Sequence, residues 1–380
     1  MNDENAPFKY GKLAEEQDFT DRETETRYLV TNFQSGINTI LISPRRWGKS
    51  SLVLKASQTA QVKNRQLKFC LIDLFKVRTE EEFYHYLAQE VVRCTSNKLD
   101  DAFEYTKKFM AKFIPKLSVN PDVNSEISLS MDWKEVKKNP DDILNLAEKI
   151  AAEKKIKMVI CIDEFQNISE FEDPLSFQKK LRSNWQKHKH ISYCLYGSKR
   201  HMMMEVFTSP SAPFYKFGDI LFLEKIKTTD WEKFIMKRFA DTGKKIEPQD
   251  ATLIATLVEN HPYYVQQLAQ QSWLRTARKC NTAIVYDAHE NLVRQMSLLF
   301  HTITDSLSTT QVNFLHTLID DVQKVSSRLI LDTYQLGTSA NIPRIREALL
   351  EKEIIDMHSG KTEFTDPLYK SWLKKYYFGR

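Results

Sequence analysis

The chain is 380 residues long, carries a formal net charge of +5 and contains 42% hydrophobic residues. This length allows a large core and predicts two or three domains of a soluble globular protein. No apolar run approaches the ~20 residues that span a bilayer, and the start, MNDENAPF, does not have a secretory pattern. We therefore expect a cytoplasmic protein without a membrane partner, whose five scattered cysteines are reduced core residues.

The first predicted elements lead into a strand, a tight loop and a helix. A helix is predicted from about Arg22 to Phe33, with Asp21 as its cap and Gly36 at its end. The apolar run 39–42 then predicts a buried strand. It stops at the loop S-P-R-R-W-G-K-S-S, residues 43–51, and apolar residues at helical spacing follow.

This loop has the composition of a phosphate-binding loop. It follows the pattern G-x-x-x-x-G-K-S/T, with Ser43 at the first glycine position. Lys49 is placed to reach the β and γ oxygens of a nucleoside triphosphate, and the Ser50 hydroxyl to ligate Mg²⁺. The alternative is a chance strand–turn–helix with an exposed lysine. The predicted nucleotide-binding residues are Pro44, Arg45, Arg46, Trp47, Gly48, Lys49, Ser50 and Ser51.

Four further apolar runs complete a predicted parallel sheet. They lie at 67–75, 157–162, 191–196 and 219–223, with helical patterns at about 80–94 and 141–152. An irregular insertion occupies residues 96–140. Five apolar strands with intervening helices predict an α/β fold, a parallel sheet with helices on both faces.

Polar residues follow two of these strands. Asp163 and Glu164 come directly after the run 157–162, at the carboxyl end of a buried strand where ligands of open α/β sheets bind. Asp163 is placed to hold Mg²⁺, and Glu164 to polarise an attacking water. Ser198 follows the run 191–196 and is a candidate sensor of the γ-phosphate or of that water. The alternatives are a helix cap for the acidic pair and an ordinary turn residue for Ser198.

The strand pattern stops after Glu224. Helical patterns at 229–240, 248–259, 262–276 and 286–300 predict a small bundle, interpreted as a lid. Helices at 309–319, 329–336 and 342–351, followed by short strands at 354–357 and 362–364, predict a winged helix. The predicted domains are therefore a core of residues 1–225, a lid of 226–300 and a winged helix of 301–380.

The charges of the last segment argue against direct reading of DNA. Residues 300–380 contain six Lys and four Arg against six Asp and four Glu, so they are neutral. Arg344 and Arg346 stand two positions apart and point to nearly opposite sides of a helix. A DNA reader usually carries a basic third helix. A packing or regulatory role is favoured over nucleic-acid binding.

In their order along the chain, these motifs resemble those of the archaeal-type ATPase family of the AAA+ superfamily, close to the signal-transduction ATPases with numerous domains. The resemblance covers nearly the full length. It rests on F-T-D-R-E at 19–23, S-P-R-R-W-G-K-S-S-L at 43–52, D-E-F-Q at 163–166, Y-G-S at 196–198, H-P-Y-Y at 261–264 and F-T-D-P-L at 364–368.

The resemblance implies a P-loop core that binds ATP and Mg²⁺, a helical lid and a winged helix. It implies that Lys49 and Ser50 bind phosphate and metal, that Asp163 completes the metal site, and that Glu164 is the catalytic base. Ser198 matches the first sensor position. The segment around Phe19 and Arg22 matches the part that borders the base in related proteins, and Pro262 belongs to the lid motif near the nucleotide.

Two departures from the family pattern stand out. Ser43 replaces the usual glycine, and Lys216 stands where relatives often have arginine. A lysine lacks the planar fork that bridges two phosphate oxygens, so it is a poorer charge-stabilising finger. We expect an ATPase whose turnover is slow or gated by a protein partner. A nucleotide-loaded adaptor with negligible turnover and a DNA-acting ATPase are the alternatives, and the oligomeric state is left open.

Overall fold

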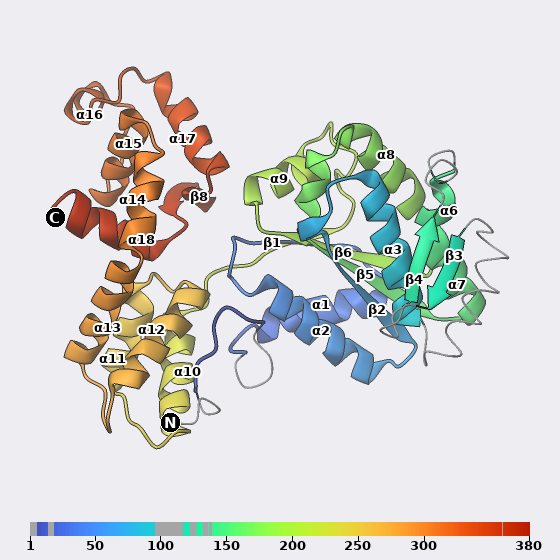
Figure 1. Cartoon of the computed structure of the whole chain (residues 1–380), viewed down its shortest axis with the longest axis horizontal. Coiled ribbons are helices and arrows are strands. Elements are labelled where there is room, and N and C mark those ends of the chain that lie inside the picture. Colours follow the sequence, from blue (N-terminus) through green and yellow to red (C-terminus); the bar gives the residue numbers. More distant parts are fainter. Residues whose placement is uncertain are drawn as a thin grey trace. The chain divides into compact units, whose positions relative to one another are not determined.

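The computed structural model describes residues 6–13, 19–95, 117–121, 127–131, 136, 139–358 and 360–380 (Figure 1). The chain forms two compact units. We call Arg22–Arg45 with Lys49–Glu224 the sheet unit, and Met1–Asp21, Arg46–Gly48 and Lys225–Arg380 the C-terminal unit. Most of the insertion predicted at 96–140 lies outside the described residues. Within it, β3 (Leu117–Pro121) and β4 (Ile127–Met131) pair antiparallel.

The predicted five-stranded parallel sheet is confirmed. Its order is β2-β5-β6-β1-β7, and every neighbouring pair is parallel. The phosphate-loop strand β1 therefore has a neighbour on each side. Both β1 and β6 are buried at every position, as expected for strands that helices cover on two faces. The strands are β1 (Thr39–Ile42), β2 (Leu67–Asp73), β5 (Lys157–Asp163), β6 (Ile191–Gly197) and β7 (Asp219–Phe222).

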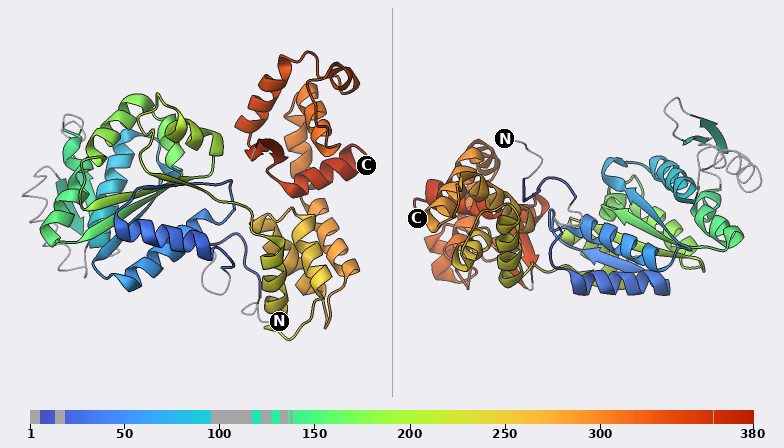
Figure 2. Two further views of the ribbon diagram at one scale, coloured as in Figure 1. Left: turned by 180° about the vertical axis from the view of Figure 1, so that it is seen from behind. Right: turned by 90° about the horizontal axis from the view of Figure 1, so that it is seen from below.

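Helices cover both faces of this sheet. Helices α1 and α2 pack together on one face, and α3, α8 and α9 lie on the other (Figures 1 and 2). A 3-10 turn, Leu74–Lys76, follows β2, so the predicted strand 67–75 is too long. The helices are α1 (Glu23–Ser35), α2 (Lys49–Lys63), α3 (Glu80–Thr95), α6 (Asp141–Leu144), α7 (Leu146–Lys154), α8 (Pro174–Trp185) and α9 (Arg200–Thr208).

The beginning of α1 differs from the prediction. Its cap position is Arg22, not Asp21, and no side chain caps the helix. Arg22 has a left-handed backbone with φ +68°. The end is as predicted, because Gly36 with φ +71° donates its N–H to carbonyls of the last turn. Local sequence therefore predicted the glycine stop but not the residue at the cap position of the start.

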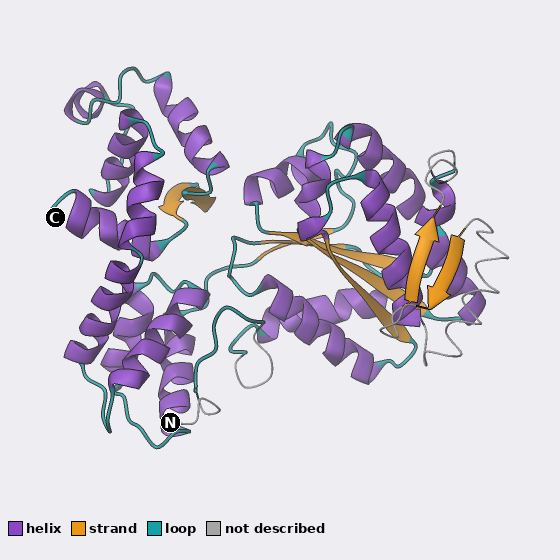
Figure 3. Cartoon of the chain, viewed as in Figure 1, coloured by secondary structure: helices purple, strands orange, loops and turns teal. Residues whose placement is uncertain are grey.

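The C-terminal unit is mainly helical, with one pair of short strands (Figure 3). The predicted helix 286–300 is interrupted, since α13 (Thr282–Gln295) ends before α14 (Ser297–Asp305) begins. Helices α15 (Thr309–Ile319), α16 (Arg328–Thr333) and α17 (Asn341–Glu351) precede the antiparallel pair β8 (Ile355–His358) and β9 (Lys361–Phe364). The remaining helices are α10 (Thr228–Ala240), α11 (Pro248–Leu257), α12 (Pro262–Arg275) and α18 (Pro367–Trp372), with a π-helix at Leu373–Tyr377.

One hydrophobic core runs through the C-terminal unit, from Trp231 in α10 to Trp372 in α18. Tyr264 in α12 donates a hydrogen bond to Asp366, whose carboxylate also caps α18. Lys370 pairs with Glu259 at 2.5 Å. The separation into a lid and a winged helix stays a prediction. None of the described helices is long and apolar enough to cross a membrane.

A half-buried histidine contacts Tyr193 in β6. His188 Nδ1 lies 2.8 Å from the Tyr193 hydroxyl, and Nε2 lies 2.9 Å from Asn145 Oδ1. The Asn145 amide nitrogen donates to Asn184, so its oxygen is the acceptor and Nε2 carries the proton. Burial lowers the pKa of His188 to about 4, and the charge of Glu148 opposes this only in part.

This histidine predicts a pH-dependent stability. The unfolded chain takes up a proton at His188 near pH 6.5 and the folded chain only near pH 4, so stability falls as the pH drops through this window. We expect His188→Gln to reduce the wild-type loss between pH 7 and pH 4 by about 2 kcal/mol. Urea unfolding at several pH values measures it. The exposed His201→Gln is the control, and an unchanged pH dependence in His188→Gln would contradict the assignment.

Candidate nucleotide-binding site

The loop between β1 and α2 has a backbone suited to an anion. Arg46 and Gly48 have left-handed conformations, with φ +63° and +86°. A side chain at Gly48 would be strained in this conformation, which accounts for that glycine. Ser43 is not among the positive-φ residues and is buried, so this position of the motif does not need a glycine here. Helix α2 begins at Lys49, and the first N–H groups of a helix lack intrahelical acceptors.

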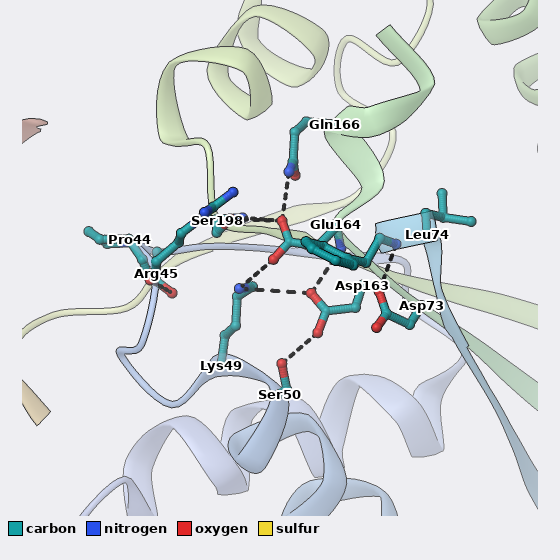
Figure 4. Close-up of polar contacts among 12 residues, drawn as sticks. Pro44, Arg45, Lys49, Ser50, Asp73, Leu74, Asp163, Glu164, Gln166 and Ser198 are labelled. Carbon is teal, nitrogen blue, oxygen red and sulfur yellow. Dashed lines mark hydrogen bonds and ion pairs between the residues drawn. The ribbon is translucent and has the colours of Figure 1, made fainter. Parts of the chain in front are cut away.

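The side chains of Lys49 and Ser50 meet the acidic pair after β5 (Figure 4). Lys49 Nζ lies 3.1 Å from Glu164 Oε1 and 3.8 Å from Asp163 Oδ1. The Ser50 hydroxyl donates to Asp163 Oδ2 at 2.5 Å. Residues 115 positions apart are thus joined by an ion pair with little solvent exposure.

Glu164 is held on its other oxygen by the end of β6. Oε2 accepts hydrogen bonds from Ser198 Oγ at 2.7 Å, from Ser198 N at 3.2 Å and from Gln166 Nε2 at 2.6 Å. Glu164 itself has φ +50°, which turns the chain out of β5 into the 3-10 helix Phe165–Glu170. The register places Ile162 beside Leu195, so the residues after both strands lie close together.

The two carboxylates have different environments. Burial raises the pKa of Asp163, and the Lys49 charge and the Ser50 hydrogen bond offset this only in part. Burial acts in the same direction on Glu164, but the Lys49 charge and the hydrogen bonds from Gln166, Ser198 and Lys49 outweigh it. The pKa of Glu164 is therefore lowered, and this carboxylate stays ionised at neutral pH.

The structure joins six of the predicted site residues through side-chain contacts. Lys49, Ser50, Asp163, Glu164 and Ser198 form one connected cluster, and Arg45 Nε lies 3.4 Å from Ser198 Oγ. Beside them, Pro44 is half-buried and Ser51 is buried.

Other predicted residues belong to the C-terminal unit or have other partners. Arg46 and Trp47 belong to the C-terminal unit, where Arg46 Cζ lies 4.6 Å from the ring centre of Tyr263 and Trp47 meets His261 edge to face. Pro262 begins α12 in the same unit. Phe19 is half-buried there, and Arg22 in the sheet unit is buried and bonded to Glu25 at 2.9 Å. Their roles toward a nucleotide stay predictions.

Sequence reasoning overlooked Gln166 as a site residue. Its amide donates directly to the predicted base, although the sequence shows it only as the last letter of the motif D-E-F-Q. Asn167 supports it from the next position, with its amide nitrogen 3.0 Å from the Leu74 carbonyl. The only available signal was the position two residues after Glu164, which does not reveal the direction of a side chain.

Comparisons with known proteins identify the family. Residues 19–268 match the family model described as an ATPase domain predominantly from Archaea. No curated protein matches the chain. Among solved structures, the Walker-type ATPase of Pyrococcus abyssi has a TM-score of 0.62 at 18% identity, covering 97% of this chain and 99% of that chain.

A second similar structure is the ORC2 protein of Aeropyrum pernix in its ADPNP–ADP complexes, with a TM-score of 0.57 and 14% identity over 95% of this chain and 94% of that chain. At these identities the two structures support the fold alone. Since the family model spans more than half of the sequence, the chain belongs to the family of ATPase domains found predominantly in Archaea and has the P-loop fold of the AAA+ class.

Proposed function

We propose that this protein binds ATP with Mg²⁺ and hydrolyses it slowly, as a molecular switch gated by a protein partner. The cluster of Lys49, Ser50, Asp163, Glu164 and Ser198 is the observation that carries the proposal. It joins an ammonium group, two hydroxyls and two carboxylates at the carboxyl ends of parallel strands. In open α/β sheets, ligands bind at these strand ends.

The donor atoms suit both expected ligands. Mg²⁺ in ATPase sites is usually bound by one or two carboxylates together with phosphates and water, and prefers oxygen ligands. Ser50 Oγ and Asp163 Oδ2, which are 2.5 Å apart, offer this set. The left-handed loop and the start of α2 present N–H groups to an anion. When bound, Mg²⁺ neutralises charge on the phosphate oxygens.

Three residues of the chain have separate roles in the proposed hydrolysis. Lys49 stabilises charge that develops on the γ-phosphoryl group, and Glu164 orients the attacking water and accepts its proton. The lowered pKa of Glu164 keeps the carboxylate ionised for this role. Ser198 holds Glu164 Oε2 through both its hydroxyl and its backbone N–H.

An ion pair restrains both principal groups. Lys49 and Glu164 are bound to each other at 3.1 Å, so neither can act on a phosphate or on water until the pair separates. This requirement supports slow or gated turnover. It also supports the second candidate function, a nucleotide-loaded adaptor with negligible turnover. In such an adaptor the ion pair between Lys49 and Glu164 would persist for most of the time, so Glu164 would rarely be free to activate water.

Arg22 is proposed to border the nucleotide base, together with Phe19. The side chain of Arg22 is buried, and Nη1 is bonded to Glu25. Its Nη2 has no hydrogen-bond partner in the described part of the chain. A buried guanidinium nitrogen without an acceptor costs free energy, so an acceptor on the ligand would repay it. Pro262 is proposed to contact the nucleotide from the lid.

A protein is the partner that the surface charges favour. Arg344 is exposed and Arg346 half-buried on α17, with the carboxylates of Glu347 and Glu351 on the same helix. Residues 300–380 are neutral overall, so the sequence-independent attraction to phosphates that dominates DNA affinity is weak. DNA binding is therefore the less favoured role.

Lys49→Ala should weaken the binding of ATP strongly. The variant loses an ammonium group bound to phosphate, and hydrogen bonds to charged groups are worth about 1.5–3 kcal/mol each, so we expect a loss of about a hundredfold in affinity. Calorimetric titration with Mg-ATP measures it, and a thermal melt without ATP checks folding. Lys63→Ala, exposed at the other end of α2, is the control. Wild-type affinity in Lys49→Ala would refute the phosphate site.

Glu164→Gln should separate binding from turnover. The variant keeps the size of the side chain but loses the base, so we expect Mg-ATP affinity within threefold of wild type and phosphate release lowered at least about a hundredfold. The exposed Glu172→Gln is the matched control. If Glu164→Gln turns over at the wild-type rate, Glu164 is not the base. A wild type that binds ATP without releasing phosphate would instead identify the adaptor.

A further inference from the structure

We infer that Gln166 is a positioning residue for the carboxylate of Glu164, and that Gly197 is a glycine because it leaves room for the Gln166 amide. The inference rests on the proposed function, since it assigns a device that orients the base. Neither Gln166 nor Gly197 has a binding or catalytic role in the proposed function. Both lie in the sheet unit, at the ends of the neighbouring strands β5 and β6.

The contacts of Gln166 fix the direction of its amide. The residue is 1% exposed, and Nε2 lies 2.6 Å from Glu164 Oε2 and 3.4 Å from Asn167 Oδ1. A carboxylate oxygen accepts but does not donate when ionised, so the nitrogen and not the oxygen must face Glu164. Figure 4 shows the amide pointing at this carboxylate from the side away from Lys49.

Gly197 provides the space for this arrangement. A Cβ atom at Gly197 would lie 1.9 Å from Gln166 Oε1 and 3.1 Å from Gln166 Cδ. The backbone of Gly197 is an ordinary strand backbone and not left-handed, so its conformation alone does not require a glycine. Met203 Sδ, at 2.9 Å, is the end of a flexible side chain and can move. The Gln166 amide is therefore the obstacle to any larger residue.

The unpaired oxygen of Gln166 argues against a purely structural role. Oε1 is buried and has no hydrogen-bond partner in the described residues. Buried polar atoms without partners are rare because each costs free energy. An apolar side chain of the same length would fill this space without that cost. The hydrogen bond that the amide nitrogen Nε2 donates to Glu164 explains why an amide group is present at this position.

The consequence is a carboxylate held at one oxygen. Three donors, from Gln166 and from the hydroxyl and backbone of Ser198, converge on Glu164 Oε2. Among the described residues, Oε1 forms its hydrogen bond and ion pair only with the Lys49 ammonium. When Lys49 turns to phosphate, Oε1 is the atom that faces water, already in a fixed orientation. A small error in the orientation of the Glu164 carboxylate would lower the rate of hydrolysis without weakening the binding of ATP.

The test begins with Gln166→Met, which keeps the length and removes the donor. We expect kcat for Mg-ATP hydrolysis to fall about tenfold or more, with KM and the Kd for Mg-ATP within twofold of wild type and no loss of thermal stability. Gln178→Met, at another buried glutamine of the sheet unit, is the control and should retain wild-type kcat. If Gln166→Met does not fold, Gln166→Asn, one methylene too short to reach Glu164, is judged by the same criterion.

A double-mutant cycle then tests the role of Gly197. Gly197→Ala should lower kcat as much as Gln166→Met, because the new methyl group displaces the amide. In a Gln166→Ala background the obstructing amide is gone and only the flexible end of Met203 must move, so Gly197→Ala should lower kcat by less than a further twofold. Independent, multiplicative losses would overturn the proposed link between the two residues.

The outcomes separate this inference from the function on which it rests. If wild type hydrolyses ATP, Glu164→Gln does not, and Gln166→Met retains wild-type kcat, the inference fails and the function stands. A rise in KM at unchanged kcat in Gln166→Met also overturns the inference. If wild type and Glu164→Gln release phosphate equally, Glu164 is not the base. The positioning role of Gln166 is then rejected as well, because it depends on that assignment.

Discussion

The ion pair between Lys49 and Glu164 is the interaction on which the rest of the site depends. A buried cation needs a compensating charge, and here the compensation comes from a residue 115 positions away. The pair can form only because β6 lies between β1 and β5 in the sheet, which brings the start of α2 and the end of β5 to opposite sides of the same strand end. Ser198, at the end of β6, therefore lies against Glu164.

This arrangement separates the roles of two adjacent carboxylates. Asp163 is bonded to Ser50 and has a raised pKa, because burial outweighs its favourable contacts. Glu164 has more donors and a lowered pKa. The backbone of Glu164 is left-handed, and the two side chains have different hydrogen-bond partners, Ser50 for Asp163 and Gln166 with Ser198 for Glu164. This division agrees with the separate metal and water roles that we propose for them.

The C-terminal unit follows a different principle. Its helices share one continuous core, and Tyr264, Asp366, Lys370 and Glu259 link the segment around α12 to the segment around α18. The switch that we propose would need its segments linked in this way.

The sequence by itself determined the five strands, the phosphate loop, the acidic pair and most helix positions, because apolar runs, a glycine and a lysine act over a few neighbouring residues. It did not determine the start of α1 at Arg22 or the break at Met296, where the local pattern continues without a signal. Only the tertiary structure decided that Gln166 donates to Glu164 and that Gly197 leaves room for it. These contacts depend on the register of β5 against β6, which joins residues far apart in the chain and is set by the packing of the whole sheet.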